Sequence, residues 1–127
     1  MGIALAYEAS ALGAEVDLVL GPVNLTPSGE NITVTHVTTA ATMEEACIYK
    51  FRNCDIAILS AAVADFTPAE VKRSKMKKGK DEFTLPLRPT TDIAAALGKL
   101  KKPGQILVGF ALETDNEIKN AVQKLEN

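Results

Sequence analysis

The sequence predicts an α/β fold in which helices cover both faces of a mostly parallel sheet. Apolar runs of strand length alternate with stretches of helical periodicity along all 127 residues. The run over 31–37 alternates, but the strand-like runs as a set are too hydrophobic to leave one sheet face to solvent. Strands that alternate with helices in this way are typical of a parallel sheet between two helical layers. The length suits one domain over residues 1–127.

The first half of the chain predicts two helices and two strands. Apolar residues recur at helical spacing in the opening stretch, and Gly13 is a natural helix stop. Thr42 is the expected N-cap of the second helix, because Glu45 follows three residues later, the spacing of a capping box. The expected elements are a helix over 3–12, a strand within 14–22, a strand over 31–37 and a helix over 38–53.

The second half predicts three strands and two helices around a lysine-rich loop. Pro86 restricts the middle strand to a sheet edge or a hairpin arm, because proline cannot donate to a strand ladder. Thr91 begins the next helix, which Pro103 and Gly104 end. The expected elements are a strand over 54–60, the loop over 71–82, a strand over 82–89, a helix from 91, a strand over 105–114 and a closing helix over 116–127.

The order of the elements is unusual at both ends. An α/β domain of this kind usually begins with a strand and a loop before its first helix. This sequence opens in a helix and also closes in one. We therefore expect an internal piece of a longer protein that lacks the first strand and the C-terminal end of the fold.

Composition excludes several classes of protein. A net charge of −2 argues against a general nucleic-acid binder, although Lys72–Lys80 is strongly basic. Cys47 and Cys54 match no zinc or redox spacing and are expected to be reduced core thiols. No stretch approaches the ~20 apolar residues of a membrane span, and no signal peptide is recognisable. The cytoplasm is the expected compartment.

The residues after the strand over 54–60 are the main candidates for a binding site. Parallel sheets bind ligands beyond the carboxyl ends of their strands. Ala61 and Ala62 leave the backbone open to a phosphate or a base edge, and Asp65 could hold ribose hydroxyls, a base amino group or a metal. Lysines from Lys75 onward could reach a polyphosphate. An ordinary turn followed by a solvated charged loop explains the same pattern.

The strand over 105–114 ends in a second candidate stretch. Phe110 could stack on a base, or could be an ordinary core aromatic. Glu113 could bind a metal or substrate, or could cap the closing helix. His36 is the only histidine, so a histidine-based metal site and Ser-His or Cys-His catalysis are excluded. The sequence contains neither G-x-G-x-x-G nor a Walker A motif.

An ordered set of segments resembles one enzyme family. These segments are GPV, AAVADF, SKMKKGKDEFTLPL, TTDIAAALG and VGFALET, and the opening MGIALA is similar to the end of the family's S-S-G-x-M-G segment. Together they resemble phosphopantothenoylcysteine synthetase, also called phosphopantothenate–cysteine ligase. The resemblance spans nearly the whole chain. It adds a specific activity to the α/β fold that the pattern of elements predicts.

The resemblance implies a Rossmann-like fold, a homodimer and a ligase of coenzyme A biosynthesis. Such an enzyme joins 4′-phosphopantothenate to cysteine with CTP and a divalent cation, Mg²⁺ or Mn²⁺. The pantothenate carboxylate attacks the α-phosphate to give an acyl-cytidylate and pyrophosphate, and the cysteine amine then releases CMP. Eukaryotic relatives can prefer ATP. In many bacteria this ligase is fused to a flavin-dependent decarboxylase half.

The resemblance also implies roles for individual residues. Asp65 corresponds to a nucleotide contact, and Lys75 to the cation that stabilises the phosphates and the acyl-cytidylate, which makes it the expected catalytic residue. The family's P-D-I-V nucleotide segment corresponds to Thr91, Asp92, Ile93 and Ala94, with threonine in place of proline. Phe110 and Lys124 match two further nucleotide positions.

Two other classes of function stay open on the residues alone. A dinucleotide-binding oxidoreductase module would use NAD(P)H and would need its glycine-rich loop upstream of this sequence. A non-catalytic α/β interaction domain would carry the basic loop only as a solvated surface.

Overall fold

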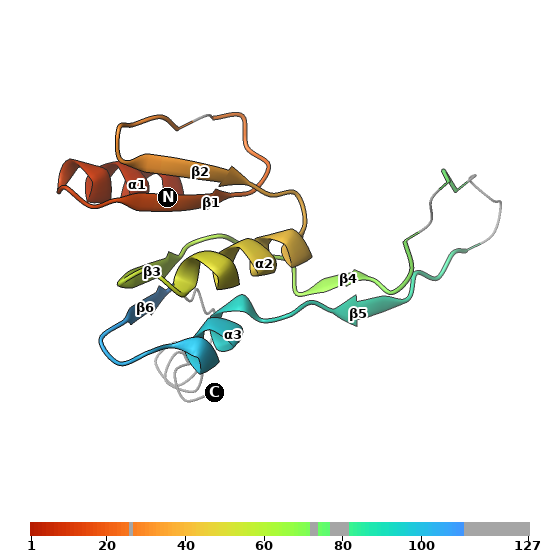
Figure 1. Cartoon of the computed structure of the whole chain (residues 1–127). Helices are drawn as coiled ribbons and strands as arrows, with labels where there is room; N and C mark the ends of the chain where they lie inside the picture. Colours follow the sequence, from red (N-terminus) through yellow and green to blue (C-terminus); the bar gives the residue numbers. More distant parts are fainter. Residues whose placement is uncertain (26, 72–73, 77–81, 111–127) are drawn as a thin grey trace.

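The computed structural model describes residues 1–25, 27–71, 74–76 and 82–110. The described chain alternates between helices and strands, as the sequence predicts (Figure 1). The elements in order are α1 Gly2–Ala11, β1 Val16–Leu20, β2 Ile32–His36, α2 Ala40–Phe51, β3 Ile56–Leu59, β4 Phe66–Pro68, β5 Leu87–Pro89, α3 Ile93–Leu100 and β6 Ile106–Gly109.

Two pairs of parallel strands form the centre of the fold. β1 pairs with β2 from Val16↔Ile32 to Leu20↔His36, and β3 pairs with β6 from Ile56↔Ile106 to Leu59↔Gly109. Within the described ranges these two pairs are not hydrogen-bonded to each other. The parallel pairing confirms the predicted α/β class. It also brings the carboxyl ends of neighbouring strands to one edge, where a ligand is expected.

The core lies where α2 and α3 cover one face of the β3–β6 pair. Phe51 is 3% exposed and Leu97 1%, and both pack with Ile93 against the inward-facing side chains of β3 and β6. Burying side chains of this size stabilises the fold by about 1.5–3 kcal/mol each. The opposite face of the same strands consists of exposed apolar side chains, namely Ile56, Ile58, Ile106 and Val108.

The N-terminus of α2 corrects the prediction that Thr42 is its cap. Thr39 is the N-cap: its hydroxyl accepts from the backbone N–H of Thr42, and the hydroxyl of Thr42 accepts from the N–H of Thr39, both at 3.1 Å. The capping box is therefore a pair of threonines, and Glu45 has no part in it. The alanines at 40 and 41 favour helix, so the N-cap lies three residues before the predicted one, at Thr39.

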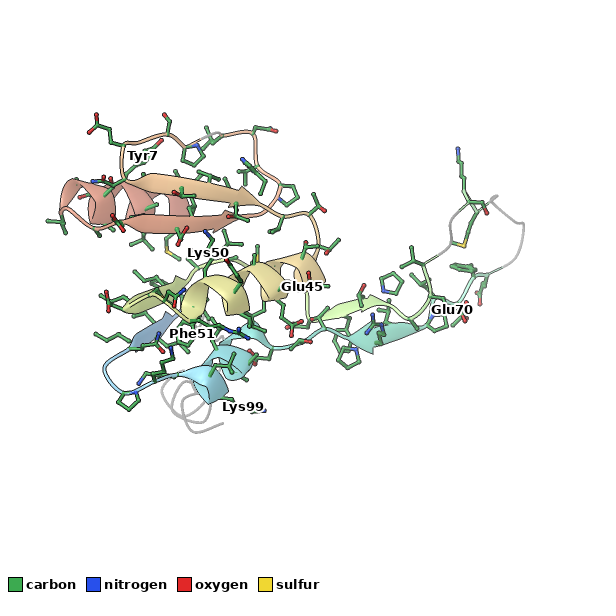
Figure 2. All side chains as sticks on the ribbon, in the orientation of Figure 1. Tyr7, Glu45, Lys50, Phe51, Glu70 and Lys99 are labelled. Atoms are coloured by element: carbon green, nitrogen blue, oxygen red, sulfur yellow. The ribbon has the colours of Figure 1, made fainter. Side chains whose placement is uncertain are left out.

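Polar contacts tie α2 to its neighbours. Lys50 reaches from α2 to Asp17 on β1 as an ion pair (Figure 2), but both side chains are partly solvated, so the pair adds about 0–1 kcal/mol. The side-chain amide of Gln105 donates to the carbonyls of Phe51 and Cys54 at 2.8 and 2.7 Å. This amide fixes the end of α2 to the start of β6.

β4 and β5 form an antiparallel ribbon that projects from the rest of the fold (Figure 1). The ribbon leaves the fold at the edge where the parallel strands have their carboxyl ends. The strand predicted over 82–89 is confined to Leu87–Pro89, and its partner Phe66–Pro68 falls where no strand was predicted. A three-residue strand that ends in proline has no alternation to detect. Because Phe66 opposes Pro89 and Pro68 opposes Leu87, these four apolar side chains share one exposed face of the ribbon.

The two cysteines are free and partly buried, in agreement with the expectation of reduced core thiols. Burial raises the pKa of both the Cys47 and the Cys54 thiol. No helix in the described part of the chain is long and apolar enough to cross a membrane.

Candidate functional site

The segment that follows β3 is open to solvent at the edge where helices begin. Ala61, Ala62 and Asp65 are all exposed, and Ser60 before them is half-buried. The ribbon leaves the body at this edge, and α3 returns to it (Figure 1). A ligand at this exit would therefore meet bare backbone from 61–65 and the first turns of the neighbouring helices.

The N-terminus of α1 lies directly against the exit of β3. A Cβ atom on Gly2 would come within 2.7 Å of the Ser60 Oγ, so the start of α1 lies close to Ser60, and a larger residue at position 2 would require the Ser60 hydroxyl to rotate away. Among the residues that the structure describes, none caps α1 with its side chain, and the first turn contains no acidic residue. Its first N–H groups and the positive end of its dipole are therefore suited to an anion such as a phosphate.

The N-terminus of α3 has a different character, because a carboxylate caps it. Asp92 Oδ1 accepts from the backbone N–H of Ala95 at 3.0 Å. Ile93 points into the core, at 8% exposed, so only its backbone can face a ligand. The N–H groups of Ile93 and Ala94 have no partner among the residues the structure describes. The negative charge of Asp92 suits hydroxyl or amino donors of a ligand better than a phosphate.

Thr90 joins these two parts of the site, and sequence reasoning missed it. Its hydroxyl donates to the carbonyl of Ala64 at 2.6 Å, and its backbone N–H donates to the carbonyl of Asp65 at 2.9 Å. The predicted residues at 61–65 and at 91–94 are thereby held side by side. Only the adjacent T-T-D run hinted at Thr90, because the pairing spans 26 residues.

Phe110 follows β6 and stands next to the exit of β3, because Gly109 pairs with Leu59. Its side chain is 55% exposed. The ring is thus available for stacking, and its contact with a nucleotide stays a prediction. The predicted positions Glu113 and Lys124 lie outside the described residues.

The structure does not bring Lys75 to Asp65 within one chain. The ribbon is still paired at Ala69, whose N–H donates to the carbonyl of Pro86 at 2.9 Å. Residues 74–76 lie beyond that outer end of the ribbon, away from the exit of β3 (Figure 1). The Lys75 side chain is exposed there. The other basic residues of the predicted loop fall outside the described ranges.

Comparison with known proteins decides the family. The family described as the DNA/pantothenate metabolism flavoprotein C-terminal domain matches residues 1–127. The chain belongs to this family. The ordered motifs of the sequence had indicated the same kinship, through the resemblance to phosphopantothenoylcysteine synthetase, and that resemblance is confirmed.

Curated relatives of this family domain are much longer than the chain. The chain is 47% identical over 125 residues to the coenzyme A biosynthesis bifunctional protein CoaBC of Bacillus subtilis. The matched residues make up 98% of this chain and 30% of that protein. It is 62% identical over 126 residues to a protein of an unknown prokaryotic organism named cysteine/cysteine sulfinic acid decarboxylase, covering 99% of the chain and 35% of that protein. The chain thus spans about a third of the length of these relatives.

Solved structures of the family agree with the fold. The crystal structure of the C-terminal domain of the coenzyme A biosynthesis bifunctional protein CoaBC superposes with a TM-score of 0.82 at 40% identity, over 98% of this chain and 57% of that one. A DNA/pantothenate metabolism flavoprotein from Streptococcus pneumoniae gives a TM-score of 0.78 at 21% identity, over 98% and 65% of the two chains, which supports the fold alone.

The family domain contains no dedicated metal cluster in its described ranges, where no three His, Cys, Asp or Glu side chains come together. A magnesium ion that enters with a nucleotide does not need one, because it is held by the phosphates and one or two carboxylates.

Proposed function

We propose that this chain is the ligase part of a coenzyme A biosynthesis protein, joining 4′-phosphopantothenate to cysteine at the expense of CTP. The family and the relatives named CoaBC support a place in coenzyme A biosynthesis. The proposed metal is Mg²⁺ or Mn²⁺ carried by the triphosphate. The cytoplasm is the compartment that this activity implies. A fused decarboxylase domain is part of the proposal, because the relatives are about three times as long.

One observation carries the proposal: two helix N-termini of opposite character flank the exit of β3. The uncapped start of α1 beside Ser60 suits the negatively charged phosphates. The carboxylates of Asp65 and Asp92 suit the ribose hydroxyls and the amino group of cytosine, which are hydrogen-bond donors. A nucleoside triphosphate has this same division, with an anionic end and a neutral end rich in donors.

The proposed reaction has two steps. A carboxylate oxygen of phosphopantothenate attacks the α-phosphorus of CTP, the bond to the β-phosphate oxygen breaks, and pyrophosphate leaves. The cysteine amine then attacks the acyl carbonyl, loses a proton and displaces CMP. Attack of one anion on another requires positive charge at the site, which the N–H groups of α1 supply in part. Lys75 is the side chain proposed to complete it.

Lys75 is proposed to reach the phosphates in a homodimer, since residues 74–76 lie beyond the outer end of the ribbon in their own chain. A two-stranded ribbon with an exposed apolar face is marginally stable by itself. Phe66 and Leu87 on that face are 59% and 55% exposed, so a second copy packed there would cover them. Pro68 and Pro89 each remove a donor from the ribbon, which favours packing by the face over pairing by the edge.

The test is pyrophosphate release by the full-length protein. We expect release only when CTP, phosphopantothenate and cysteine are present together. Lys75→Ala should lower the rate by about 100-fold or more, because a cation aimed at developing charge is lost. Lys99→Ala is the matched control, since Lys99 is an exposed lysine in the last turn of α3 (Figure 2), and it should retain the full rate.

Several outcomes would contradict the proposal. CO₂ release from cysteine by this domain without pyrophosphate would favour the activity named for the 62% identical relative. Binding of NADH in preference to CTP would favour an oxidoreductase module. Full activity of Lys75→Ala would remove the role given to that lysine. In the dimer proposal, mixing inactive Lys75→Ala and Asp65→Ala subunits should restore about a quarter of the wild-type rate, because half of the dimers then carry one intact site.

A further inference from the structure

We propose that Thr90 is a positioning residue that aims the carboxylate of Asp65 at the nucleotide. The inference rests on the proposed function, because it assigns a purpose to Asp65 at the same site. Thr90 follows β5 directly and precedes the N-cap of α3 by two residues. It is therefore the point at which the ribbon, the exit of β3 and α3 meet.

The two hydrogen bonds of Thr90 flank the α-carbon of Asp65. The hydroxyl holds the carbonyl of Ala64 at 2.6 Å, and this carbonyl belongs to the peptide plane before Asp65. The backbone N–H holds the carbonyl of Asp65 at 2.9 Å, which belongs to the plane after it. Peptide units are rigid planes joined only by φ and ψ, so fixing both planes fixes the direction of the Cα–Cβ bond. Thr90 thus restrains the direction in which the Asp65 side chain leaves the backbone.

Asp65 has little else to hold it in place. The side chain is exposed, and residues 60–65 form neither helix nor strand. Among the described residues, the Thr90 hydroxyl makes the only side-chain hydrogen bond to 61–65. Loss of this hydroxyl would free the plane before Asp65 while leaving the ribbon ladder intact. We therefore expect loss of the Thr90 hydroxyl to affect the orientation of Asp65 more than the stability of the fold.

Thr90 also fixes the relation between two carboxylates. Asp92 is held at the start of α3 by its bond to the N–H of Ala95 at 3.0 Å. Asp65 is held through Thr90, two residues before Asp92. The separation of the two carboxylates is then fixed before a ribose or a base binds, and the hydrogen-bond donors of that group can contact both. Such preorganisation strengthens binding without a new contact.

The experiment compares isosteric variants in the full-length protein, with CTP affinity measured by isothermal titration calorimetry. Thr90→Val keeps the shape and removes only the hydroxyl, and it should weaken CTP by about threefold to tenfold, the value of one hydrogen bond. Thr90→Ser restores the hydroxyl and should bind within about twofold of the wild type. Thr67→Val, a matched change on β4 whose hydroxyl bonds to no described residue, should leave affinity unchanged.

A double-mutant cycle separates positioning from a merely structural role. If Thr90 acts through Asp65, Thr90→Val should have almost no further effect on CTP affinity in an Asp65→Asn background. Additive losses would overturn the inference, as would wild-type affinity in Thr90→Val or failure of Thr90→Ser to rescue. Failure of the wild-type protein to bind CTP would overturn the proposed function, and this inference with it. Wild-type binding that Thr90→Val leaves unchanged would overturn the inference alone.

Discussion

Replacement of Asp92 separates its role as a helix cap from its role as a ligand contact. The Asp92 carboxylate accepts from the Ala95 N–H at 3.0 Å at the start of α3. Asp92→Asn keeps an oxygen acceptor in the same position, whereas Asp92→Ala removes it. The two variants should therefore differ in stability but agree in any effect that requires the negative charge.

The structure sets the size of each effect. Loss of an N-cap costs about 1 kcal/mol, within a range of about 0.5–2. Loss of the charge beside the positive end of α3 adds at most about 0.3–1 kcal/mol, and the smaller figure applies because Asp92 is exposed and screened by solvent. We expect Asp92→Ala to lower the free energy of unfolding by about 1–1.5 kcal/mol and Asp92→Asn by about 0.3.

The assay is urea unfolding of the full-length protein, followed by CTP titration of each variant. Thr39→Ala removes the equivalent cap on α2 and should cost about as much stability as Asp92→Ala while CTP affinity stays unchanged. Both Asp92 variants should weaken CTP by about tenfold, because a charge-assisted bond to the ligand is lost. Equal stability of Asp92→Ala and the wild type would refute the capping argument. Normal CTP affinity of Asp92→Asn would refute the proposed ligand contact.

Two further predictions concern the core and its thiols. Leu97→Ala should lower the free energy of unfolding in urea by about 2–5 kcal/mol, because Leu97 is 1% exposed. Leu100 is 45% exposed, so Leu100→Ala should lower it by less than about 1 kcal/mol, and equal losses would contradict the assigned core. Burial raises the pKa of Cys47, so the folded state holds the thiol proton more tightly than the unfolded state. Stability should therefore fall as pH rises above the unfolded value of about 8.5, and this slope between pH 8 and 10 should flatten in Cys47→Ala; an unchanged slope would contradict the burial effect.

Local patterns were enough to predict most of the body. The helix over 3–12, the strand over 31–37 and the helix over 38–53 correspond to α1, β2 and α2, because each has a strong period of its own. Gly13 ends α1 as expected, with a φ of 90° that favours glycine. The predicted N-cap of α2 was wrong because Thr39 and Thr42 both fit the capping pattern, and only the hydrogen bonds distinguish them.

The ribbon and the two hydrogen bonds of Thr90 at its base could not be predicted, since both depend on pairing between distant residues. β4 is too short to carry a strand signal and exists only because β5, about twenty residues later, pairs with it. The distance of Lys75 from the exit of β3 follows from that ribbon. Near neighbours in sequence, such as Asp65 and Lys75, suggest proximity that an extended ribbon removes.

The sequence alone determined the α/β class and the family, and it singled out the stretches that are proposed to bind a ligand, because periodicity and ordered motifs are local properties of the chain. Tertiary structure decided how those stretches meet. It placed the start of α1 against Ser60, joined Ala64 and Asp65 to Thr90, and placed residues 74–76 beyond the outer end of the ribbon. Hydrogen bonds and close packing between residues far apart in sequence leave no local pattern, so only the folded chain reveals them.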